Sequence, residues 1–269
     1  MVAARRRYMP GDVATINHMT QELLRQDAYL RECDAHITAM TDTGGIVLDR
    51  TVFYPLGGGQ AGDSGVLVLA DGSSVVIADT RKGKDADGNA TSAIVHLPAP
   101  GQEERVAQLA VGAPVTARID WERRHRMMRL HTTSHLLCHV VPQLVNGCSI
   151  TPDYARLDFA MTDPLDKEAL TTAIAALVAA AHPLTVASIS DEELDANPAL
   201  VKSMSVQPPR GTGRIRTIRI GGDSGTAAID LQPCGGTHVA NTAEIGAIAV
   251  TKIEKKSATT RRVVLGFAQ

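Results

Sequence analysis

Aromatic residues are nearly missing from this 269-residue chain, at 3% of the sequence. A core must therefore be built from Val, Ile, Leu and Ala. The chain is 44% hydrophobic and 21% charged, which is ordinary for a globular protein. Its length allows one large domain or two modest ones.

Long apolar runs and a secretory signal are also missing. No apolar run reaches the roughly 20 residues of a membrane-spanning helix. The N-terminus, MVAARRRYMPGDVATINHM, is basic but lacks the apolar stretch of a signal peptide. We therefore expect a cytoplasmic protein with no membrane association.

Neither sign of charge is in excess, since the formal net charge is −2. The bulk signature of a nucleic-acid-binding protein is therefore lacking, and any RNA contact must come from local clusters. The four cysteines, Cys33, Cys138, Cys148 and Cys234, do not suggest a disulfide framework in a reducing compartment. Metal binding or burial explains them better.

Residues 30–120 contain short β-rich runs separated by Gly and Asp, including a hairpin signal at Asp71-Gly72. This pattern predicts a small β-barrel, with the polar segment 81–91 as a connection. From Asp120 the pattern changes to a long helix. A second helix is expected with Asp163 as its cap and Pro164 in its first turn, and a short one after Ser190. The fold class predicted for residues 121–269 is α+β with a mixed or antiparallel sheet.

Four residues are spaced as two pairs of metal ligands. His131 and His135 are four apart, on one face of the long helix, and Cys234 and His238 flank a GGT turn. A single such histidine is more often a core or surface residue, but the two matched pairs favour tetrahedral Zn²⁺, one per chain. His139 is excluded because its axial distance from His131 is about 12 Å. Thr132 stands where a zinc peptidase has Glu, so that activity is excluded too.

Several motifs together resemble the editing domain of alanyl-tRNA synthetase and its free-standing relatives, the AlaX proteins. They are FYPLGGGQAGDSG (53–65), IDWERRHRMMRLH (119–131), HTTSHLL (131–137), RLDF (156–159), CGGTHV (234–239) and TAEIG (242–246). The ligand pairs alone also occur in editing domains of threonyl-tRNA synthetases, but the GGGQ loop favours the alanine branch. Ala243 departs from the family, which often has Gly there.

The resemblance covers the chain from about Thr20 onward. It implies a β-barrel domain at 19–120 that carries the GGGQ loop, and a zinc-binding editing domain at 121–269. Residues 1–18 are expected to be a disordered extension or the product of a start codon placed too far upstream. The implied activity is hydrolysis, in trans, of seryl-tRNA(Ala), with glycyl-tRNA(Ala) left open as a second substrate. The implied partner is tRNA(Ala) carrying a wrong amino acid.

The resemblance also suggests site residues. The proposed catalytic residues are Gln60, His131 and His135, with Gln60 holding substrate or water. The proposed substrate-binding residues are Gly57, Gly58, Gly59, Ser149, Thr151 and Arg156. Whether zinc activates water or positions substrate stays open, and no carboxylate stands out as general base. The neighbouring ribose hydroxyl of the substrate is one alternative.

Two basic clusters are the candidate RNA contacts. One lies on the long helix, and the other lies in TKIEKKSATTRR near the C-terminus. The residues chosen from them are Arg124, Arg129, Lys252, Lys255, Arg261 and Arg262. Two other functions compete with editing of tRNA(Ala). One is a non-catalytic zinc module that binds RNA, and the other is a hydrolase for another aminoacyl-tRNA such as Ser-tRNA(Thr). The oligomeric state is not predicted.

Overall fold

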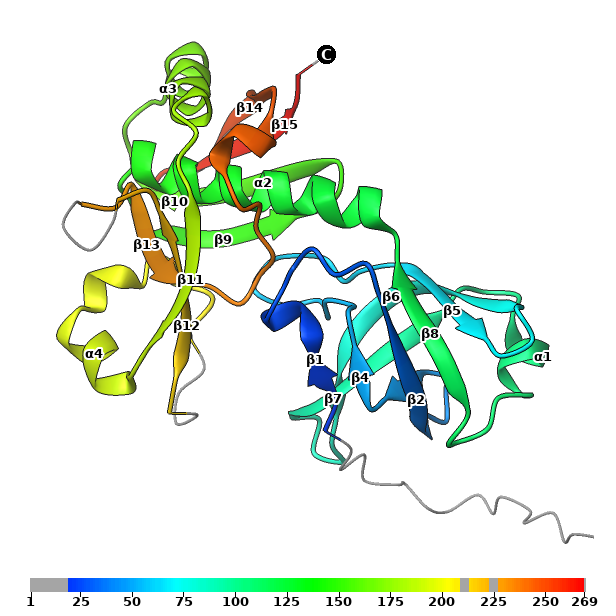
Figure 1. Cartoon of the computed structure of the whole chain (residues 1–269). Coiled ribbons are helices and arrows are strands. Elements are labelled where there is room, and N and C mark those ends of the chain that lie inside the picture. The colour runs from blue at the N-terminus through cyan, green and yellow to red at the C-terminus, as the bar shows by residue number, and fades with distance from the viewer. Residues whose placement is uncertain (1–18, 209–212, 223–226, 269) are drawn as a thin grey trace, which may run out of the picture.

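The computed structural model describes residues 19–208, 213–222 and 227–268 as an α+β protein (Figure 1). The predicted extension at residues 1–18 lies outside these residues. Within them, no helix is both long and apolar enough to cross a bilayer.

Six antiparallel strands of the N-terminal half pair in the closed order β2-β3-β7-β6-β5-β8. These strands are β2 (Glu32–Met40), β3 (Ile46–Leu48), β5 (Gly65–Leu69), β6 (Ser74–Lys84), β7 (Ala90–Pro98) and β8 (Pro114–Ile119). The short elements β1 (Gln21–Glu22), η1 (Leu23–Arg25), β4 (Arg50–Thr51) and α1 (Glu103–Val106) accompany them. Aliphatic side chains and Phe53 fill the interior, and Gly72 takes a φ of 81° in the predicted hairpin turn.

The prediction of a polar connection at 81–91 was wrong. Strand β6 continues to Lys84 and β7 begins at Ala90, so most of the segment is a hairpin. Its turn is closed by Asp85, whose carboxylate accepts backbone N–H groups of Asp87 at 3.0 Å and Asn89 at 2.8 Å. The polar residues of the turn therefore hid, at the level of the sequence, the end of β6 and the start of β7.

The C-terminal half consists of α2 (Trp121–Val140) and two antiparallel sheets. One sheet has the order β14-β15-β10-β9 and the other β11-β12-β13. Their strands are β9 (Val145–Ile150), β10 (Tyr154–Ala160), β11 (Leu184–Ile189), β12 (Ile215–Ile220), β13 (Asp230–Pro233), β14 (Ile248–Ser257) and β15 (Thr260–Phe267). The remaining elements are α3 (Lys167–Ala179), α4 (Asp191–Ala196), η2 (Pro198–Leu200) and η3 (Thr242–Ile245). Helix α2 lies across the four-stranded sheet (Figure 1), and its apolar face packs into the larger core.

Helix starts follow local capping chemistry. Asp120 caps α2 as predicted, since its carboxylate accepts the N–H of Arg123 at 3.1 Å. Ser190 and Glu193 form a capping box at α4. Helix α3, however, begins after Asp166 rather than Asp163, because Asp166 accepts the N–H of Ala169 at 2.7 Å.

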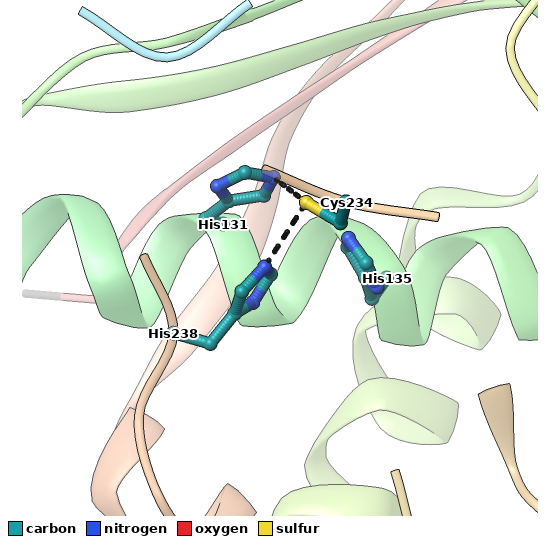
Figure 2. A group of neighbouring side chains, drawn as sticks. All are labelled: His131, His135, Cys234 and His238. Atoms are coloured by element: carbon teal, nitrogen blue, oxygen red, sulfur yellow. Dashed lines mark hydrogen bonds between the residues drawn. The ribbon is translucent and has the colours of Figure 1, made fainter. Parts of the chain in front are cut away.

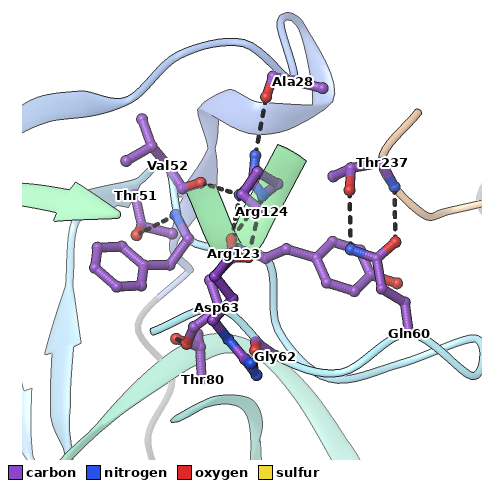
Figure 3. Close-up of polar contacts among 12 residues, drawn as sticks. Ala28, Thr51, Val52, Gln60, Gly62, Asp63, Thr80, Arg123, Arg124 and Thr237 are labelled. Atoms are coloured by element: carbon purple, nitrogen blue, oxygen red, sulfur yellow. Dashed lines mark hydrogen bonds and ion pairs between the residues drawn. The ribbon is translucent and has the colours of Figure 1, made fainter. Parts of the chain in front are cut away.

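The two halves meet at the start of α2. Trp121 packs against both cores. Arg124 is fully buried and forms an ion pair with Asp63 of the barrel half, and it donates to the carbonyls of Val52 at 2.7 Å and Ala28 at 3.0 Å (Figure 3). Its guanidinium has no surface left for a phosphate. The prediction that Arg124 contacts RNA was therefore wrong.

Candidate active site

The two predicted ligand pairs come together at one point (Figure 2). The ligand atoms of His131, His135, Cys234 and His238 all lie within 4.8 Å of one another. Cys234 Sγ is 3.5 Å from His131 Nε2 and 3.3 Å from His238 Nε2. His139 is exposed and lies outside the group. The spacing argument therefore selected the residues that the fold brings together.

Each histidine is oriented through its other ring nitrogen. His131 Nδ1 lies 2.8 Å from Gln60 Oε1, and His135 Nδ1 lies 2.9 Å from Asp230 Oδ2. Because an amide oxygen and a carboxylate only accept, these two imidazoles donate from Nδ1, and in the neutral form their Nε2 lone pair faces the cluster. Three imidazoles and one sulfur, each supported from behind, are a donor set that fits tetrahedral zinc.

The third histidine, His238, places its Nδ1 3.2 Å from the hydroxyl of Thr132. That hydroxyl also accepts the N–H of Val239 at 3.3 Å. Thr132 occupies the place where a zinc peptidase has a glutamate, so here the position orients a ligand instead of supplying a base.

The charges of the cluster favour a thiolate. Burial raises the pKa of Cys234, but His131 and His238 outweigh burial and hold this pKa well below its usual value. Burial lowers the pKa of His135, but Asp230 and Cys234 outweigh it and raise this pKa to about 9. A deprotonated sulfur is the form that binds a metal.

Asp230 was not identified from the sequence. It is buried on β13, and besides His135 it binds Lys202 and accepts from Gln232 Nε2 at 2.8 Å. Burial raises the pKa of Asp230, but His135 and Lys202 outweigh it and lower this pKa below the usual range. Its position four residues before Cys234 was the available signal, since metal-binding histidines commonly donate to a carboxylate.

The loop that carries Cys234 is held by two arginines from distant parts of the chain. Arg216 Nη1 donates to the carbonyls of Cys234 at 2.6 Å and Gly236 at 3.0 Å, and Arg25 donates to the carbonyl of Gly235. Three successive carbonyls thus accept from guanidinium groups. A Cβ at Gly236 would lie 2.1 Å from His131 Cε1, so the position requires glycine.

The side-chain amide of Gln60 is occupied by hydrogen bonds within the protein. It is buried, its Oε1 accepts from His131 and from the N–H of Thr237 at 3.0 Å, and its Nε2 donates to Thr237 Oγ1 at 2.9 Å (Figure 3). These contacts favour a positioning role for Gln60 over direct contact with the substrate. The preceding residue, Gly59, has a φ of 85° and packs closely against β9, where a Cβ would lie 2.2 Å from Cys148 Sγ.

A cavity of about 740 Å³ opens beside the cluster, between the two halves. Its lining from the barrel half includes Tyr54, Gly57 and Gly58, and its lining from α2 includes Ser134. Cys138 is buried in the core, one of the two explanations offered for the cysteines, and it also lines the cavity.

Four predicted substrate-binding residues are not among the residues that line this cavity, namely Gly59, Ser149, Thr151 and Arg156. Cys148, Ile150 and Leu157 line it. Successive side chains of a strand point to opposite faces, so Ser149 on β9 and Arg156 on β10 are turned away. Thr151 is instead a turn residue whose hydroxyl donates to the carbonyl of Tyr154 at 3.1 Å. Their proposed contact with substrate is therefore corrected.

None of the predicted RNA contacts lines the cavity. Arg129 donates to the carbonyl of Ile245 at 2.7 Å, and the nearly buried Arg261 donates to the carbonyl of Ser257 at 3.2 Å. Arg262 pairs with Asp158, and Lys252 with Glu254. These four cations have partners within the chain, whereas Lys255 is exposed on β14 without an ion pair among the described residues.

Family models match both halves. The model described as the threonyl and alanyl tRNA synthetase second additional domain matches residues 215–264. The model described as tRNA synthetases class II (A) matches residues 18–123. The first range includes Cys234 and His238, and the second includes Gln60.

Curated relatives match nearly the whole chain. The alanyl-tRNA editing protein AlaX-M of Saccharolobus solfataricus is 32% identical over 249 residues, covering 91% of this chain and 98% of the relative. The AlaX-M protein of Methanosarcina acetivorans is 31% identical, with the same coverage. An alanine–tRNA ligase of Metallosphaera sedula is 35% identical over 88% of this chain but only 25% of its own length. The chain therefore belongs to the AlaX-M family of alanyl-tRNA editing proteins.

Proposed function

We propose that this protein removes a wrong amino acid from tRNA(Ala) by hydrolysing the ester to the terminal ribose, with Ser-tRNA(Ala) as its main substrate. The observation that carries the proposal is the His₃Cys cluster at the wall of a large cavity, in a chain of an editing family. A synthetase pocket for alanine rejects serine poorly, because serine only adds a hydroxyl, so a second site is needed.

The four ligands His131, His135, Cys234 and His238 would hold one Zn²⁺. When bound, zinc supplies Lewis-acid polarisation and lowers the pKa of bound water toward about 7. Gln60 and Asp230 keep His131 and His135 in the tautomer that binds metal. Among described residues that line the cavity, Glu22 is the only carboxylate, and it is paired with Arg25. The vicinal ribose hydroxyl of the substrate therefore remains the proposed proton relay.

Ser134 is the proposed reader of the serine hydroxyl. It lies on α2 between His131 and His135 and lines the cavity. Its own hydroxyl proton is given to the carbonyl of Leu130 at 2.9 Å, which leaves its oxygen lone pairs as acceptors. A serine hydroxyl can donate to this oxygen, whereas an alanine methyl leaves it unpaired. Such a loss costs about 1–3 kcal/mol, or roughly ten- to a hundredfold in rate.

We also propose the domain division from the sequence, a barrel at 19–120 and an editing domain at 121–269. In this division the barrel contributes Gln60 to the histidine cluster of the second domain. The editing domain contributes all four ligands and the serine-reading hydroxyl.

A deacylation assay with Ser-, Gly- and Ala-tRNA(Ala) tests the function. We expect Ser-tRNA(Ala) to be hydrolysed at least about tenfold faster than Ala-tRNA(Ala), and Ser134→Ala to reduce this ratio. Equal rates on both would favour a general esterase. No hydrolysis of any of them by zinc-loaded protein would favour a non-catalytic RNA-binding module.

A further inference from the structure

The cavity has an excess of positive charge. Among the described residues that line it, the cations are Arg25, Lys82, Lys202, Arg214 and Arg216, against the single carboxylate of Glu22. Arg25, Lys202 and Arg216 are held by the protein, through Glu22, Asp230 and backbone carbonyls. Arg214 donates to Ser188. These four side chains are therefore committed to the protein's own groups.

Lys82 differs from the other four. It is exposed on β6 and has no ion pair or side-chain hydrogen bond among the described residues. The nearby acidic groups do not neutralise it, because Asp79 pairs with Arg81 and Asp85 closes the hairpin turn. Lys84, two residues further along β6, is also exposed and without such a partner. Strand β6 thus carries two exposed lysines without an ion pair among the described residues. Lys82 lies at the cavity, and Lys84 follows two residues later.

An aminoacylated RNA end would enter this cavity with its ester at the histidine cluster. Its preceding nucleotides must then run out along the wall, and each carries a phosphate that lysine side chains neutralise. We propose that Lys82, followed by Lys84, binds the phosphate backbone of the single-stranded 3′ end of the RNA. This inference rests on the proposed function and replaces the basic clusters expected from the sequence.

Two exposed lysines allow a matched comparison. Lys255 on β14 was a predicted RNA contact, is equally without an ion pair among the described residues, and does not line the cavity. Lys167 on α3 is exposed, does not line the cavity and was not a predicted RNA contact. The variants Lys82→Ala, Lys84→Ala, Lys255→Ala and Lys167→Ala each remove one exposed charge, and melting temperatures check that each is folded.

The first measurement is binding of an uncharged RNA minihelix with a single-stranded 3′ end, by fluorescence anisotropy at several salt concentrations. Lys82→Ala should weaken binding about five- to tenfold and reduce the slope of log K against log salt by about 0.7, the value for one phosphate on a single strand. Lys84→Ala should have a smaller effect in the same direction. Lys167→Ala should bind as the unaltered protein does.

The second measurement compares hydrolysis of a seryl-RNA minihelix with that of seryl-adenosine, which has no phosphate. Lys82→Ala should lower kcat/KM for the minihelix about fivefold more than kcat/KM for seryl-adenosine. Unchanged RNA binding in Lys82→Ala, or a larger loss in Lys255→Ala, would overturn the inference. RNA binding that depends on Lys82, without hydrolysis of either ester, would support Lys82 as an RNA contact and reject the proposed deacylase function.

Discussion

The two halves of the molecule treat buried histidine in opposite ways. In the barrel, His96 is fully buried, its Nδ1 lies 3.0 Å from the carbonyl of Ile46, and its Nε2 lies 2.8 Å from Thr51 Oγ1. In the α+β half, His131, His135 and His238 satisfy only Nδ1 from behind. Their Nε2 atoms converge on Cys234. Burial alone therefore does not indicate a metal-binding histidine. The distinguishing feature is a ring nitrogen, here Nε2, that points into the cluster.

The same contrast appears in the charges. Burial lowers the pKa of His96 to about 4, because no acidic group faces its ring. At the cluster, Asp230 and a sulfur surround His135, and its pKa is raised to about 9 despite burial. His96 is therefore a neutral, polar residue of the barrel core. The histidine cluster instead contains negative charge, which favours binding of a cation.

The largest expected effect comes from removing a ligand. Cys234→Ala or His135→Ala should lower the zinc content from about one per chain to a small fraction and reduce deacylation by more than about a hundredfold. His96→Gln should leave the zinc content intact. Metal analysis of the purified variants makes the test. Full occupancy in Cys234→Ala would remove Cys234 from the ligand set, and zinc loss in His96→Gln would break the contrast between the halves.

The next effect is on stability against pH. The folded pKa of His96, about 4, lies below the unfolded value of 6.5, so the unfolded chain binds the proton more readily. Stability from this residue is complete above pH 6.5 and is lost as the pH falls toward 4, by about 3 kcal/mol. Urea unfolding of the unaltered protein and of His96→Gln at several pH values measures the contribution of His96 to the free energy of unfolding. Equal pH dependence in the two proteins would contradict it.

A smaller effect is expected at Gln60. Gln60→Ala removes the acceptor of His131 Nδ1–H, and loss of such a partner weakens metal binding about ten- to a hundredfold. Competition with a chromophoric chelator measures the zinc affinity, and Gln60→Glu, which keeps an acceptor, should retain more of it. Unaltered affinity together with lost deacylation would instead place Gln60 against the substrate.

The smallest effect is expected at Arg25. Arg25→Ala leaves the carbonyl of Gly235 without its donor while all four ligands remain. We expect zinc to dissociate a few-fold faster, by roughly 1 kcal/mol for one hydrogen bond. Arg118, an exposed arginine on β8 paired with Glu32, supplies the matched control Arg118→Ala. Equal zinc release from the two variants would show that the loop needs no support from Arg25.

The four-residue cluster was predictable because its signals are local. His131 and His135 lie one turn apart, and Cys234 and His238 flank one short loop, so spacing alone indicates that each pair converges. Barrel strands were likewise predicted from short β-rich runs. The α3 start was missed because Asp163 and Asp166 both suit a helix cap, and only the structure selects between them.

The support around the ligands was not predictable, because it depends on distant contacts. Gln60 meets His131 across 71 residues, and Arg25 meets Gly235 across 210. Ser149 was misplaced because the face that a strand presents to a cavity depends on its register with β10, and Thr151 because it lies in the turn after β9. Arg124 was expected at the surface as most arginines are, and its buried partner Asp63 lies 61 residues away.

Residues of the barrel half contact the loop that carries Cys234 and His238. These contacts limit which halves of related proteins can be joined. A chimera that joined this α+β half to an unrelated barrel would keep His131, His135, Cys234 and His238. It would lose the amide of Gln60 and the guanidinium of Arg25, which enter from the barrel half. It would also leave the buried charge of Arg124 without Asp63, at a cost of about 3–5 kcal/mol. Exchange of whole halves between relatives therefore succeeds only when the residues on both sides of these three contacts are kept. The two halves are in this sense inherited as a single unit.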